Sequence, residues 1–375
     1  MINSILFVTG TRADFGKIKP LLSILKARTE IKISILVTGM HLQTKYGRTI
    51  REVEKSNLGE VFTFLNRSGD DLPELILSKT IIGMSDYIKE IRPELIVVHG
   101  DRVESLAAAI VGNFNNIHVL HIEGGEVSST LDEVMRHCIT KLAHLHCVSN
   151  SSAKNRVLAM GEDPNSVFTI GSPEVDIMFS DDLPLKKTVL EHYEISFSEY
   201  AIFLYHPVSN ELSNLNHNLE VLRKILISAK YNFICIYPNN DMGSFEILNM
   251  LNSIKDFSHL KLLPSMRFEY FLTALKNAKF ILGNSSVGVR EAPVFGLPSI
   301  NVGSRQLSRS TAPTIINVDY EFESILESIN LVSRIPRVPN FGFGEGGTAE
   351  KFLEIITSDS IDKIPIQKKF LDNFI

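Results

Sequence analysis

The sequence is poor in the features that mark secreted, membrane-spanning and disulfide-bonded proteins. It holds three cysteines and no tryptophan in 375 residues. An odd number of cysteines argues against a disulfide framework, and because Cys138, Cys147 and Cys235 lie in apolar segments we expect buried free thiols. No apolar run approaches the roughly 18–20 residues that cross a bilayer, and residues 1–17 lack the basic region of a signal peptide. We therefore expect a cytoplasmic protein with no membrane partner.

An excess of positive charge is also missing. The 38 Lys and Arg residues face 43 Asp and Glu residues, which gives a formal net charge of −5, and basic residues form no long block. A nucleic-acid surface needs clustered Lys and Arg to displace counterions, so we expect no nucleic-acid partner. The chain is instead rich in apolar residues, at 44% of the total, which at this length supports packed cores for two domains.

Short apolar runs alternate with amphipathic segments along the chain. The runs of the first half predict strands at 4–10, 32–39, 94–101, 118–125, 144–150 and 167–172, and segments such as 16–28 and 132–145 between them have helical periodicity. The runs of the second half lie at 200–207, 231–241, 260–265, 279–286 and 297–304. Strands without polar alternation, separated by helices, predict parallel sheets covered on both faces.

The two series of strands predict an α/β protein with two Rossmann-like, doubly wound parallel-sheet domains. Pro173 and Pro184 flank a polar, acidic stretch that is typical of a linker, and we find no sequence repeat between the halves. We expect one domain over 1–175, a second over 185–358, and a C-terminal tail over 359–375 that packs back on the first domain. Ligands of such sheets bind outside the carboxyl ends of the strands, so we expect the site in the cleft between the domains.

The loop after the first run, TGTRADFGK (9–17), favours an anion. It matches neither G-x-G-x-x-G nor the Walker sequence, but Arg12 and Lys17 lie beside the start of a predicted helix, where backbone N–H groups attract phosphate. A tight turn with solvated charges is the alternative. His206, in YHPVSN, can donate to a phosphate oxygen or protonate a leaving group, although a single histidine before proline is also typical of a structural role.

The loop GNSSVGVRE (283–291) predicts a second phosphate contact. Ser285 and Ser286 can cap a helix and donate hydroxyl groups to a phosphate. Glu291 lies early in that helix, where a carboxylate can accept both hydroxyls of a ribose. A capped helix with an ion pair between Glu291 and Arg290 is the alternative. Phe268, in an aromatic stripe that suits a core, is a candidate to face a nucleotide base.

Carboxylates gather after two successive strands of the first half. The group also holds a histidine and an arginine, and consists of Asp101, Arg102, His121, Glu123, Glu126 and Asp132. Asp101 and Glu123 lie at strand ends, Asp132 precedes a helical segment that it could simply cap, and Glu126 is expected in solvent. Neighbouring carboxylates whose pKa values are separated by repulsion and burial form an acid/base set. The nearby His137, Cys138, His144, His146 and Cys147 lack the spacing of a metal site, so we expect no metal.

The loop motifs together resemble those of a known family. In chain order they are TGTRADFGK, TGMH, HGDR, HIEGGE, HPV, YPNND, RFEYF, GNSS, REAP, PSI and GSRQ, which span Ile5 to Arg309. This string resembles the hydrolysing UDP-N-acetylglucosamine 2-epimerases of sialic acid biosynthesis (the NeuC type), and more distantly the non-hydrolysing UDP-GlcNAc 2-epimerases. The resemblance implies a GT-B fold, no cofactor, UDP-GlcNAc and UDP as ligands, and a homodimer or homotetramer.

The resemblance also implies a reaction and roles for residues. UDP leaves C1 by anti elimination to give 2-acetamidoglucal, and addition of water then yields N-acetylmannosamine. Asp101, Glu123 and Asp132 match the family's important carboxylates, without an assignment of base or acid. Further residues match positions that hold the diphosphate, the ribose or the sugar: Arg12, Lys17, His41, Arg102, His121, His206, Ser285, Ser286, Glu291 and Arg305.

Three alternatives stay open. Enzymes of legionaminic acid synthesis act on UDP- or GDP-linked 2,4-diacetamido-2,4,6-trideoxy sugars with the same chemistry at C1 and C2, and they share nearly every motif. A non-hydrolysing epimerase would return UDP-ManNAc, but the loop HGDR here replaces the HGDT of that branch. A glycosyltransferase or a nucleotide-binding sensor can share the same fold, although paired carboxylates after adjacent strands favour an epimerase.

Overall fold

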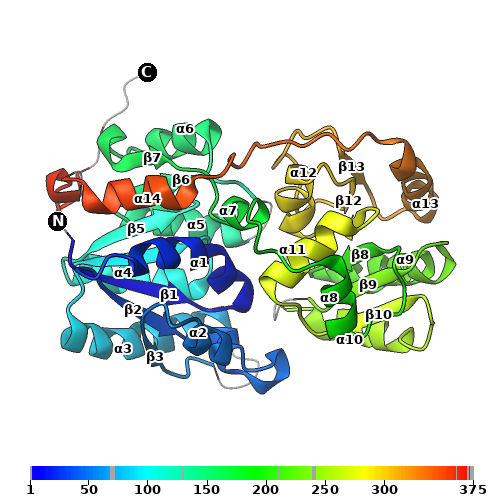
Figure 1. The fold of residues 1–375 in the computed structure, drawn as a ribbon, viewed down its shortest axis with the longest axis horizontal. Helices are drawn as coiled ribbons and strands as arrows, with labels where there is room; N and C mark the ends of the chain where they lie inside the picture. The colour runs from blue at the N-terminus through cyan, green and yellow to red at the C-terminus, as the bar shows by residue number, and fades with distance from the viewer. Residues whose placement is uncertain are drawn as a thin grey trace. The chain divides into compact units, whose positions relative to one another are not determined.

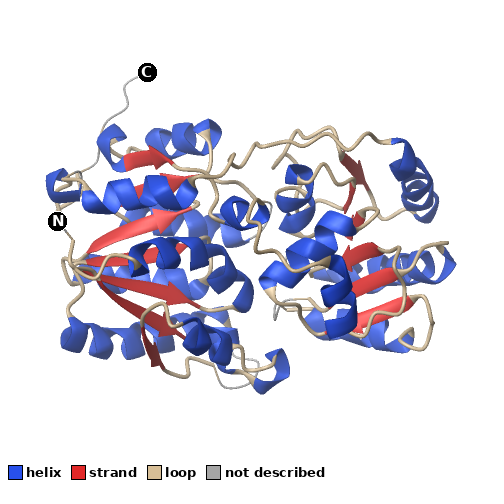
Figure 2. Cartoon of the chain, viewed as in Figure 1, coloured by secondary structure: helices blue, strands red, loops and turns tan. Residues whose placement is uncertain are grey.

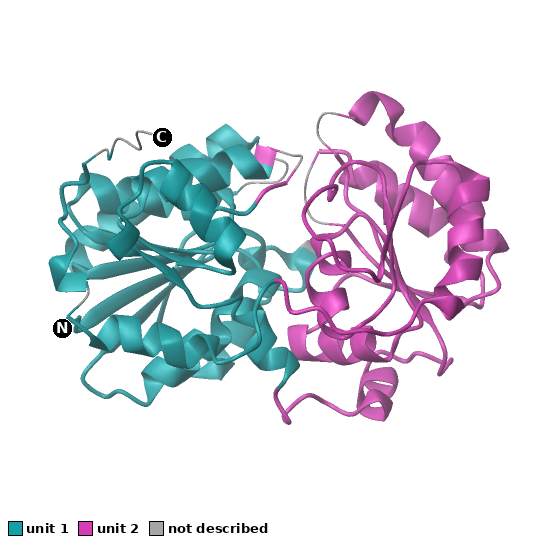
Figure 3. Cartoon of the chain, turned by 90° about the horizontal axis from the view of Figure 1, so that it is seen from above, with its two compact units in different colours: residues 1–126, 132–179, 343–375 teal, residues 127–131, 180–342 magenta. Residues whose placement is uncertain are grey.

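The computed structural model describes residues 2–67, 72–128, 131–208, 211–238, 242–359, 361–369 and 371. The chain divides into two compact units. Unit 1 contains residues 1–126, 132–179 and 343–375, and unit 2 contains residues 127–131 and 180–342 (Figure 3). Each unit has one sheet with helices on it, as Figure 2 shows by the colours of strands and helices.

Unit 1 contains a parallel sheet of seven strands in the order β3-β2-β1-β4-β5-β6-β7 (Figure 1). The strands are β1 (Ser4–Thr9), β2 (Lys32–Val37), β3 (Glu60–Thr63), β4 (Leu95–His99), β5 (His118–Ile122), β6 (Leu145–Val148) and β7 (Val167–Thr169). Its α-helices are α1 (Arg12–Lys26), α2 (Ile50–Ser56), α3 (Pro73–Ile91), α4 (Val103–Phe114), α5 (Leu131–Leu142), α6 (Ser151–Ala159), α7 (Glu174–Met178) and α14 (Thr348–Thr357).

Side chains of unit 1 are buried on both faces of the sheet, which explains the continuous apolar runs. Ile5 and Phe7 of β1 pack in a core with α1 and α14, and Leu6 and Val8 point to the opposite core with α3 and α4. Local signals set the helix starts. Thr11 caps α1, its hydroxyl accepting the Asp14 N–H at 3.1 Å, as an N-cap threonine is expected to do.

Unit 2 contains a parallel sheet of six strands in the order β10-β9-β8-β11-β12-β13. The strands are β8 (Ala201–Leu204), β9 (Phe233–Ile236), β10 (Leu260–Leu263), β11 (Ile281–Gly283), β12 (Ser299–Val302) and β13 (Ile315–Val318). Its α-helices are α8 (Lys186–His192), α9 (Leu215–Ser228), α10 (Ser244–Ser253), α11 (Phe268–Asn277), α12 (Glu291–Val294) and α13 (Phe322–Leu331). Helices α9, α10 and α13 pack on one face, and α8 and α11 on the other.

The predicted fold class of two parallel-sheet α/β domains is confirmed, and the alternation of strands and helices carried that prediction. Two strands were missed. β3 is only half-buried and carries polar residues, and β13 is an edge strand with little burial, so neither has a long apolar run. The prediction of a cleft between the domains concerns their relative placement and stays a prediction.

The predicted domain boundaries differ from those of the units. The segment expected as a linker begins with α7, which belongs to unit 1 because Val175 and Met178 are buried there. The chain returns to unit 1 at Phe343, before α14, which packs against α1. The predicted boundary at residue 358 lies too late, because the amphipathic face of α14 buries Phe352 and Ile356 in the unit 1 core.

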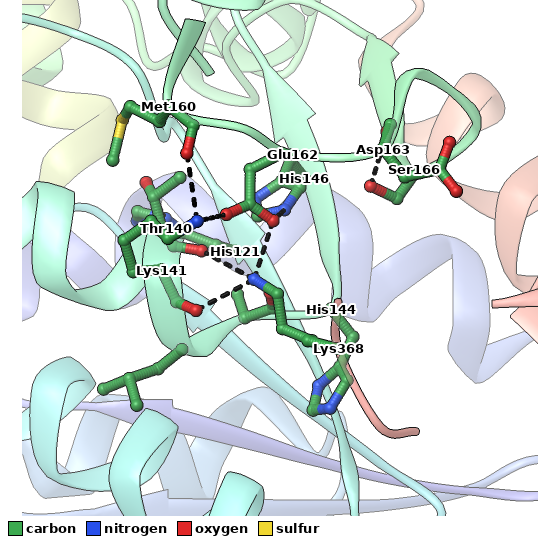
Figure 4. Close-up of polar contacts among 12 residues, drawn as sticks. His121, Thr140, Lys141, His144, His146, Met160, Glu162, Asp163, Ser166 and Lys368 are labelled. Atoms are coloured by element: carbon green, nitrogen blue, oxygen red, sulfur yellow. Dashed lines mark hydrogen bonds and ion pairs between the residues drawn. The ribbon is translucent and has the colours of Figure 1, made fainter. Parts of the chain in front are cut away.

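The C-terminal segment after α14 is held on unit 1 by polar contacts (Figure 4). The Nε2 of His118 lies 2.9 Å from the Ile364 carbonyl, and the Nε2 of His144 lies 3.0 Å from the Ile366 carbonyl. The Lys368 Nζ donates to the Lys141 carbonyl at 2.9 Å and lies 2.6 Å from the Glu162 carboxylate. This ammonium therefore lies at the C-terminal end of α5, where unpaired carbonyls and the helix dipole favour a cation.

The cysteine prediction holds in part. Cys147 and Cys235 are buried and burial raises the pKa of both thiols, but Cys138 is exposed. Cys138 lies on the outer side of α5, two residues from the buried Arg136, because an amphipathic helix exposes one face. In the described part of the chain no helix is long and apolar enough to cross a membrane.

Candidate functional site

The carboxyl ends of β4 and β5 bring the predicted carboxylates together in unit 1. These strands are neighbours, with Val98 paired to His121 and His99 paired to Ile122. Asp101 follows β4 and Glu123 follows β5, so parallel pairing delivers both to one edge of the sheet. Glu123 adopts a left-handed backbone conformation with φ of 64°, which a non-glycine residue takes only where the surroundings hold it.

His99, at the end of β4, lies between two carboxylates. Its Nδ1 is 2.8 Å from Asp14 Oδ1 and its Nε2 is 3.3 Å from Glu123 Oε2. The ring and both carboxylates are buried. Burial by itself lowers the pKa of His99, but the carboxylates of Glu123 and Asp14 raise it to about 10. Sequence reasoning missed this residue, although it opens the HGDR motif, because Asp14 lies 85 positions away.

Asp101 has a buried cationic partner as well. Its carboxylate forms an ion pair with Arg136 of α5, whose Nη1 also donates to the Glu126 carbonyl at 3.3 Å. Arg136 is 3% exposed and was not predicted. Its signal in the sequence is its position one helical turn after Asp132, since residues four apart share a helix face.

Glu126 is buried, so the prediction that it is solvated is wrong. It is 3% exposed, and its Oε1 accepts the Ser149 hydroxyl at 2.8 Å. Ser149 follows β6, the strand next to β5. A polar residue after a buried strand supplies the hydrogen bond that a buried carboxylate requires.

One face of α5 lies along this group. Asp132, Arg136 and Thr140 are spaced four apart, and Asp132 lies in the first turn. The Thr140 hydroxyl is 3.1 Å from His121 Nδ1, and the His121 Nε2 donates to the Gly100 carbonyl at 2.7 Å. Burial lowers the pKa of His121 to about 3, so its ring is neutral. His121 therefore holds the Gly100 turn that precedes Asp101.

Three predicted ligand contacts of unit 1 are engaged within the unit. The Arg12 guanidinium forms a two-point ion pair with Glu52, whose Oε2 accepts from Nε at 3.0 Å. The Lys17 Nζ lies 3.0 Å from Oε1 of the buried Glu174. His41 is 1% exposed. Its Nε2 lies 3.2 Å from the Thr9 hydroxyl, and its Nδ1 lies 2.7 Å from the Thr49 hydroxyl. Burial lowers the pKa of His41 to about 4, so its ring is neutral at pH 7.

Glu104, at the start of α4, is a second residue that the sequence did not single out. Its side chain is 1% exposed and lies 3.5 Å from the Arg102 Nε and 3.7 Å from the Arg67 Nη2. A Cβ at Gly10 would lie 2.9 Å from the Glu104 carboxyl carbon, so only glycine leaves room for this carboxylate. Glu104 thus places a buried negative charge beside the predicted Arg102 at the carboxyl edge of the sheet.

In unit 2 the loop after β8 is tied to the loop after β11. The His206 N–H donates to Asn284 Oδ1 at 2.7 Å, and Asn284 Nδ2 donates to the His206 carbonyl at 2.8 Å. The Asn284 carbonyl accepts from Arg305 at 3.2 Å, which adds the loop after β12. Burial and the positive charge of Arg305 lower the pKa of His206 to about 3. The ring is therefore neutral at pH 7, which favours hydrogen bonding over protonation of a leaving group.

The α-helix that was predicted directly after the GNSS loop begins later in the chain than expected. Ser285 accepts from the Val287 N–H at 3.4 Å and caps a 3₁₀ turn, Ser286–Gly288, and α12 begins only at Glu291. Both Ser285 and Glu291 are buried. Phe268 begins α11 and is buried, at 7% exposed.

No group of three or more His, Cys, Asp or Glu side chains suited to a metal ion occurs within the described residues. The histidines considered for a metal have other partners. The Nε2 of His146 donates to Glu162 at 3.1 Å, and His137 lies 3.6 Å from Glu133.

Comparison with known proteins gives consistent results. A family profile described as UDP-N-acetylglucosamine 2-epimerase matches residues 23–357. The chain is 41% identical over 372 residues to a UDP-N-acetylglucosamine 2-epimerase of Neisseria meningitidis serogroup B, with 98% of each chain covered. It is 30% identical to a UDP-N,N'-diacetylbacillosamine 2-epimerase (hydrolyzing) of Legionella pneumophila, with 99% of each covered. It is 31% identical to the polysialic acid biosynthesis protein P7 of Escherichia coli, with 96% of this chain and 90% of that protein covered.

The fold has a counterpart among solved structures. The crystal structure of UDP-GlcNAc 2-epimerase from Neisseria meningitidis bound to UDP-GlcNAc has a TM-score of 0.80 to this chain at 18% identity. The match covers 94% of this chain and 99% of that one. At this identity the likeness concerns the GT-B type of fold, and it agrees with the two parallel sheets described above.

Proposed function

Because the chain belongs to the UDP-N-acetylglucosamine 2-epimerase family, we propose that it is a hydrolysing member, which converts UDP-GlcNAc and water to N-acetylmannosamine and UDP. This reaction supplies the first intermediate of sialic acid biosynthesis. The observation that carries the proposal is the pair Asp101 and Glu123 at adjacent strand ends, each beside its own buried cation. Two carboxylates held in different environments suit a reaction that both removes and returns a proton.

The chemistry proceeds in two stages. A carboxylate accepts the C2 proton, the C2–H electron pair forms the C1=C2 bond, and the C1–O bond breaks with its electrons leaving on UDP. Water then adds its hydroxyl to C1 of the 2-acetamidoglucal, and a proton is delivered to C2 from the opposite face. We assign these proton transfers to Asp101, Glu123 and Asp132, since removal of a weakly acidic proton needs a well-placed base.

We assign the nucleotide to the loops of unit 2. The neutral ring of His206 can donate one hydrogen bond to a phosphate oxygen, and Arg305 can neutralise charge as UDP departs. Ser285 and Ser286 would donate hydroxyls to the diphosphate, Glu291 would accept the ribose hydroxyls, and Phe268 would contact the base. In unit 1, Arg102 is the proposed sugar or phosphate contact, and the Glu104 carboxylate lies 3.5 Å from its Nε.

A second substrate has support from a relative. The hydrolysing enzyme of Legionella pneumophila that is 30% identical acts, by its name, on UDP-N,N'-diacetylbacillosamine. That sugar differs from GlcNAc at C4 and C6, away from the proton chemistry, so the same residues would serve both substrates. Identity of 41% to a UDP-N-acetylglucosamine 2-epimerase favours UDP-GlcNAc.

The test is a proton NMR time course with UDP-GlcNAc in D2O. We expect free N-acetylmannosamine with deuterium at C2, together with UDP. Formation of UDP-ManNAc would refute the hydrolytic step. No change in UDP-GlcNAc, with turnover of the diacetamido-trideoxy sugar nucleotide, would assign the second substrate instead.

Three substitutions test the proton-transfer residues. Asp101→Asn, Glu123→Gln and Asp132→Asn are each expected to lower kcat by about 100-fold or more, because each removes a base and keeps the size of the side chain. UDP binding, measured by calorimetry, should change little. Full activity of any variant would remove that residue from the set.

A further inference from the structure

Asp14, His99 and Glu123 form a buried row in which the histidine lies between the two carboxylates. Such an arrangement can orient a catalytic group. The imidazole of His99 contacts a carboxylate through each ring nitrogen, at 2.8 Å to Asp14 and 3.3 Å to Glu123. The Nδ1 contact with Asp14 is a hydrogen bond, whereas the Nε2 contact with Glu123 is an ion-pair distance without hydrogen-bond alignment. A buried ring this close to two carboxylates, one on each side, is favoured as an imidazolium between two anions.

Asp14 is itself fixed in place. It lies in the first turn of α1, where the helix dipole stabilises an anion. Its Oδ2 accepts the Gly10 N–H at 3.3 Å, while its own N–H donates to the Thr11 hydroxyl at 3.1 Å. A carboxylate so held fixes the plane of the ring that it contacts. Asp14 can therefore orient His99, and His99 can orient Glu123.

The other groups near His99 do not supply a competing charge. His121, on the neighbouring strand, is neutral because burial lowers the pKa of its ring to about 3. After its own strand, Asp101 is engaged by Arg136. The pKa of His99 itself is raised to about 10, since Glu123 and Asp14 together outweigh the effect of burial. The ring is thus cationic through the neutral pH range.

A second His–Glu pair in the same sheet has a different environment. His146 pairs with His121 in the strand register and donates to Glu162 at 3.1 Å, but burial lowers its pKa and Lys141 and Lys368 balance Glu162. This pair lies among lysines, whereas His99 supplies the positive charge beside Glu123. The His146–Glu162 pair is therefore structural, whereas His99 sets the charge of Glu123, a proposed proton-transfer group.

We propose that His99 is a positioning residue for Glu123: its imidazolium, oriented by Asp14, holds the Glu123 carboxylate ionised and aimed, ready to accept a proton. This inference rests on the proposed function. On this inference the Glu123 side chain is an ionised carboxylate, able to act as a base, in the resting enzyme. His99 acts through Glu123, so its loss should alter kcat and the pH profile more than KM.

The first experiment needs no substrate. Full-length protein labelled with 15N-histidine is titrated by NMR, and His99→Gln identifies the His99 signals among the 11 histidines. We expect an imidazolium at pH 8. In Asp14→Asn and in Glu123→Gln, the titration midpoint of His99 should fall by about 1–3 pH units, because each variant removes a neighbouring negative charge. A neutral His99 at pH 8 in the unaltered protein would overturn the proposal.

The second experiment is the pH profile of turnover. His99→Gln is expected to lower kcat by about 100-fold. The acidic limb of the profile, where activity falls as Glu123 becomes protonated, should move to higher pH by about 1–3 units, since loss of the cation favours protonated Glu123. Asp14→Asn keeps the ring if His99→Gln does not fold. Because a titration midpoint lowered from a pKa of about 10 by about 1–3 pH units leaves His99 cationic at acidic pH, this variant should lower kcat through lost orientation without moving the limb up. His118→Gln is the matched control and should keep the original limb, because His118 begins β5, at the end away from Glu123, and contacts the Ile364 carbonyl and the His144 ring there.

The outcomes separate the two proposals. An unmoved acidic limb in folded His99→Gln refutes the positioning role, even if the enzyme hydrolyses UDP-GlcNAc as proposed. If the unaltered protein releases UDP from neither nucleotide sugar, the proposed function fails. The NMR titration alone then decides whether Asp14 and Glu123 hold His99 as a cation.

Discussion

Replacing Lys368 by methionine is expected to loosen the C-terminal end of α5. The Lys368 ammonium lies 2.6 Å from Glu162 and donates to the Lys141 carbonyl at 2.9 Å, with the Thr140 carbonyl at 3.4 Å (Figure 4). Methionine keeps much of the aliphatic stem and removes the charge. The Glu162 carboxylate then keeps Lys141 and His146 as donors, whereas the Thr140 and Lys141 carbonyls lose the ammonium that donates to them.

The magnitude follows from burial. Breaking a buried ion pair costs about 3–5 kcal/mol when the remaining charge is left uncompensated. Glu162 is 2% exposed in its side chain and Lys368 is 21% exposed, but Lys141 remains at 2.6 Å. We therefore expect a loss of about 2–4 kcal/mol for Lys368→Met. Lys141 is 41% exposed and screened by water. Lys141→Met is the matched control, with an expected loss of about 1 kcal/mol or less.

Hydrogen exchange measured by mass spectrometry is the suitable assay, since it reports the opening free energy of each segment in a protein with two units. The α5 amides should exchange faster in Lys368→Met, and those of α9 in unit 2 should be unchanged. Equal losses in Lys368→Met and Lys141→Met would show that the tail contact adds nothing beyond a surface pair, and would refute the reasoning.

The same cluster predicts a dependence on pH. Burial by itself raises the pKa of Glu162, but donors from His146, Lys141 and Lys368 lower it from 4.5 to about 2. A depressed folded-state pKa means that the stabilisation is complete above pH 4.5 and is lost as the pH falls toward 2. The protection of α5 should therefore decline over this interval in the unaltered protein, and the decline should be smaller in Glu162→Gln.

Three further predictions concern unit 2. Gly283→Ala should lower the free energy of unfolding, measured in urea, by about 2–4 kcal/mol. The φ of Gly283 is 141°, and a Cβ there would lie 2.1 Å from the Leu204 carbonyl oxygen. Gly47→Ala, where a Cβ would meet open space, should cost about 1 kcal/mol. Because the pKa of His206 is about 3, UDP affinity measured by calorimetry from pH 5 to 8 should follow parallel curves in the unaltered protein and His206→Asn; a step near pH 6.5 only in the former would contradict this. Asn284→Ala should weaken UDP binding by about 10-fold, since it removes two hydrogen bonds between the loops; unchanged affinity would show that the loops hold their positions without it.

Much of the proposed site was accessible from the sequence because parallel strands end at the same edge. Once 94–101 and 118–125 were predicted as strands of one parallel sheet, Asp101 and Glu123 had to follow their carboxyl ends. The GNSS loop was harder to predict. Its serine cap suggested a helix, but Ser285 caps only a 3₁₀ turn, since the chain turns again before Glu291.

The sequence by itself determined the class of fold, through the apolar runs that only a doubly covered sheet can bury. It also determined which side chains follow each strand. The tertiary structure alone decided their charge partners. Asp14 meets His99, Arg136 meets Asp101, and Lys368 meets Glu162 across separations that no local pattern encodes. The protonation state of a buried group depends on these neighbours in space, so the chemistry of the site was set by packing rather than by spacing along the chain.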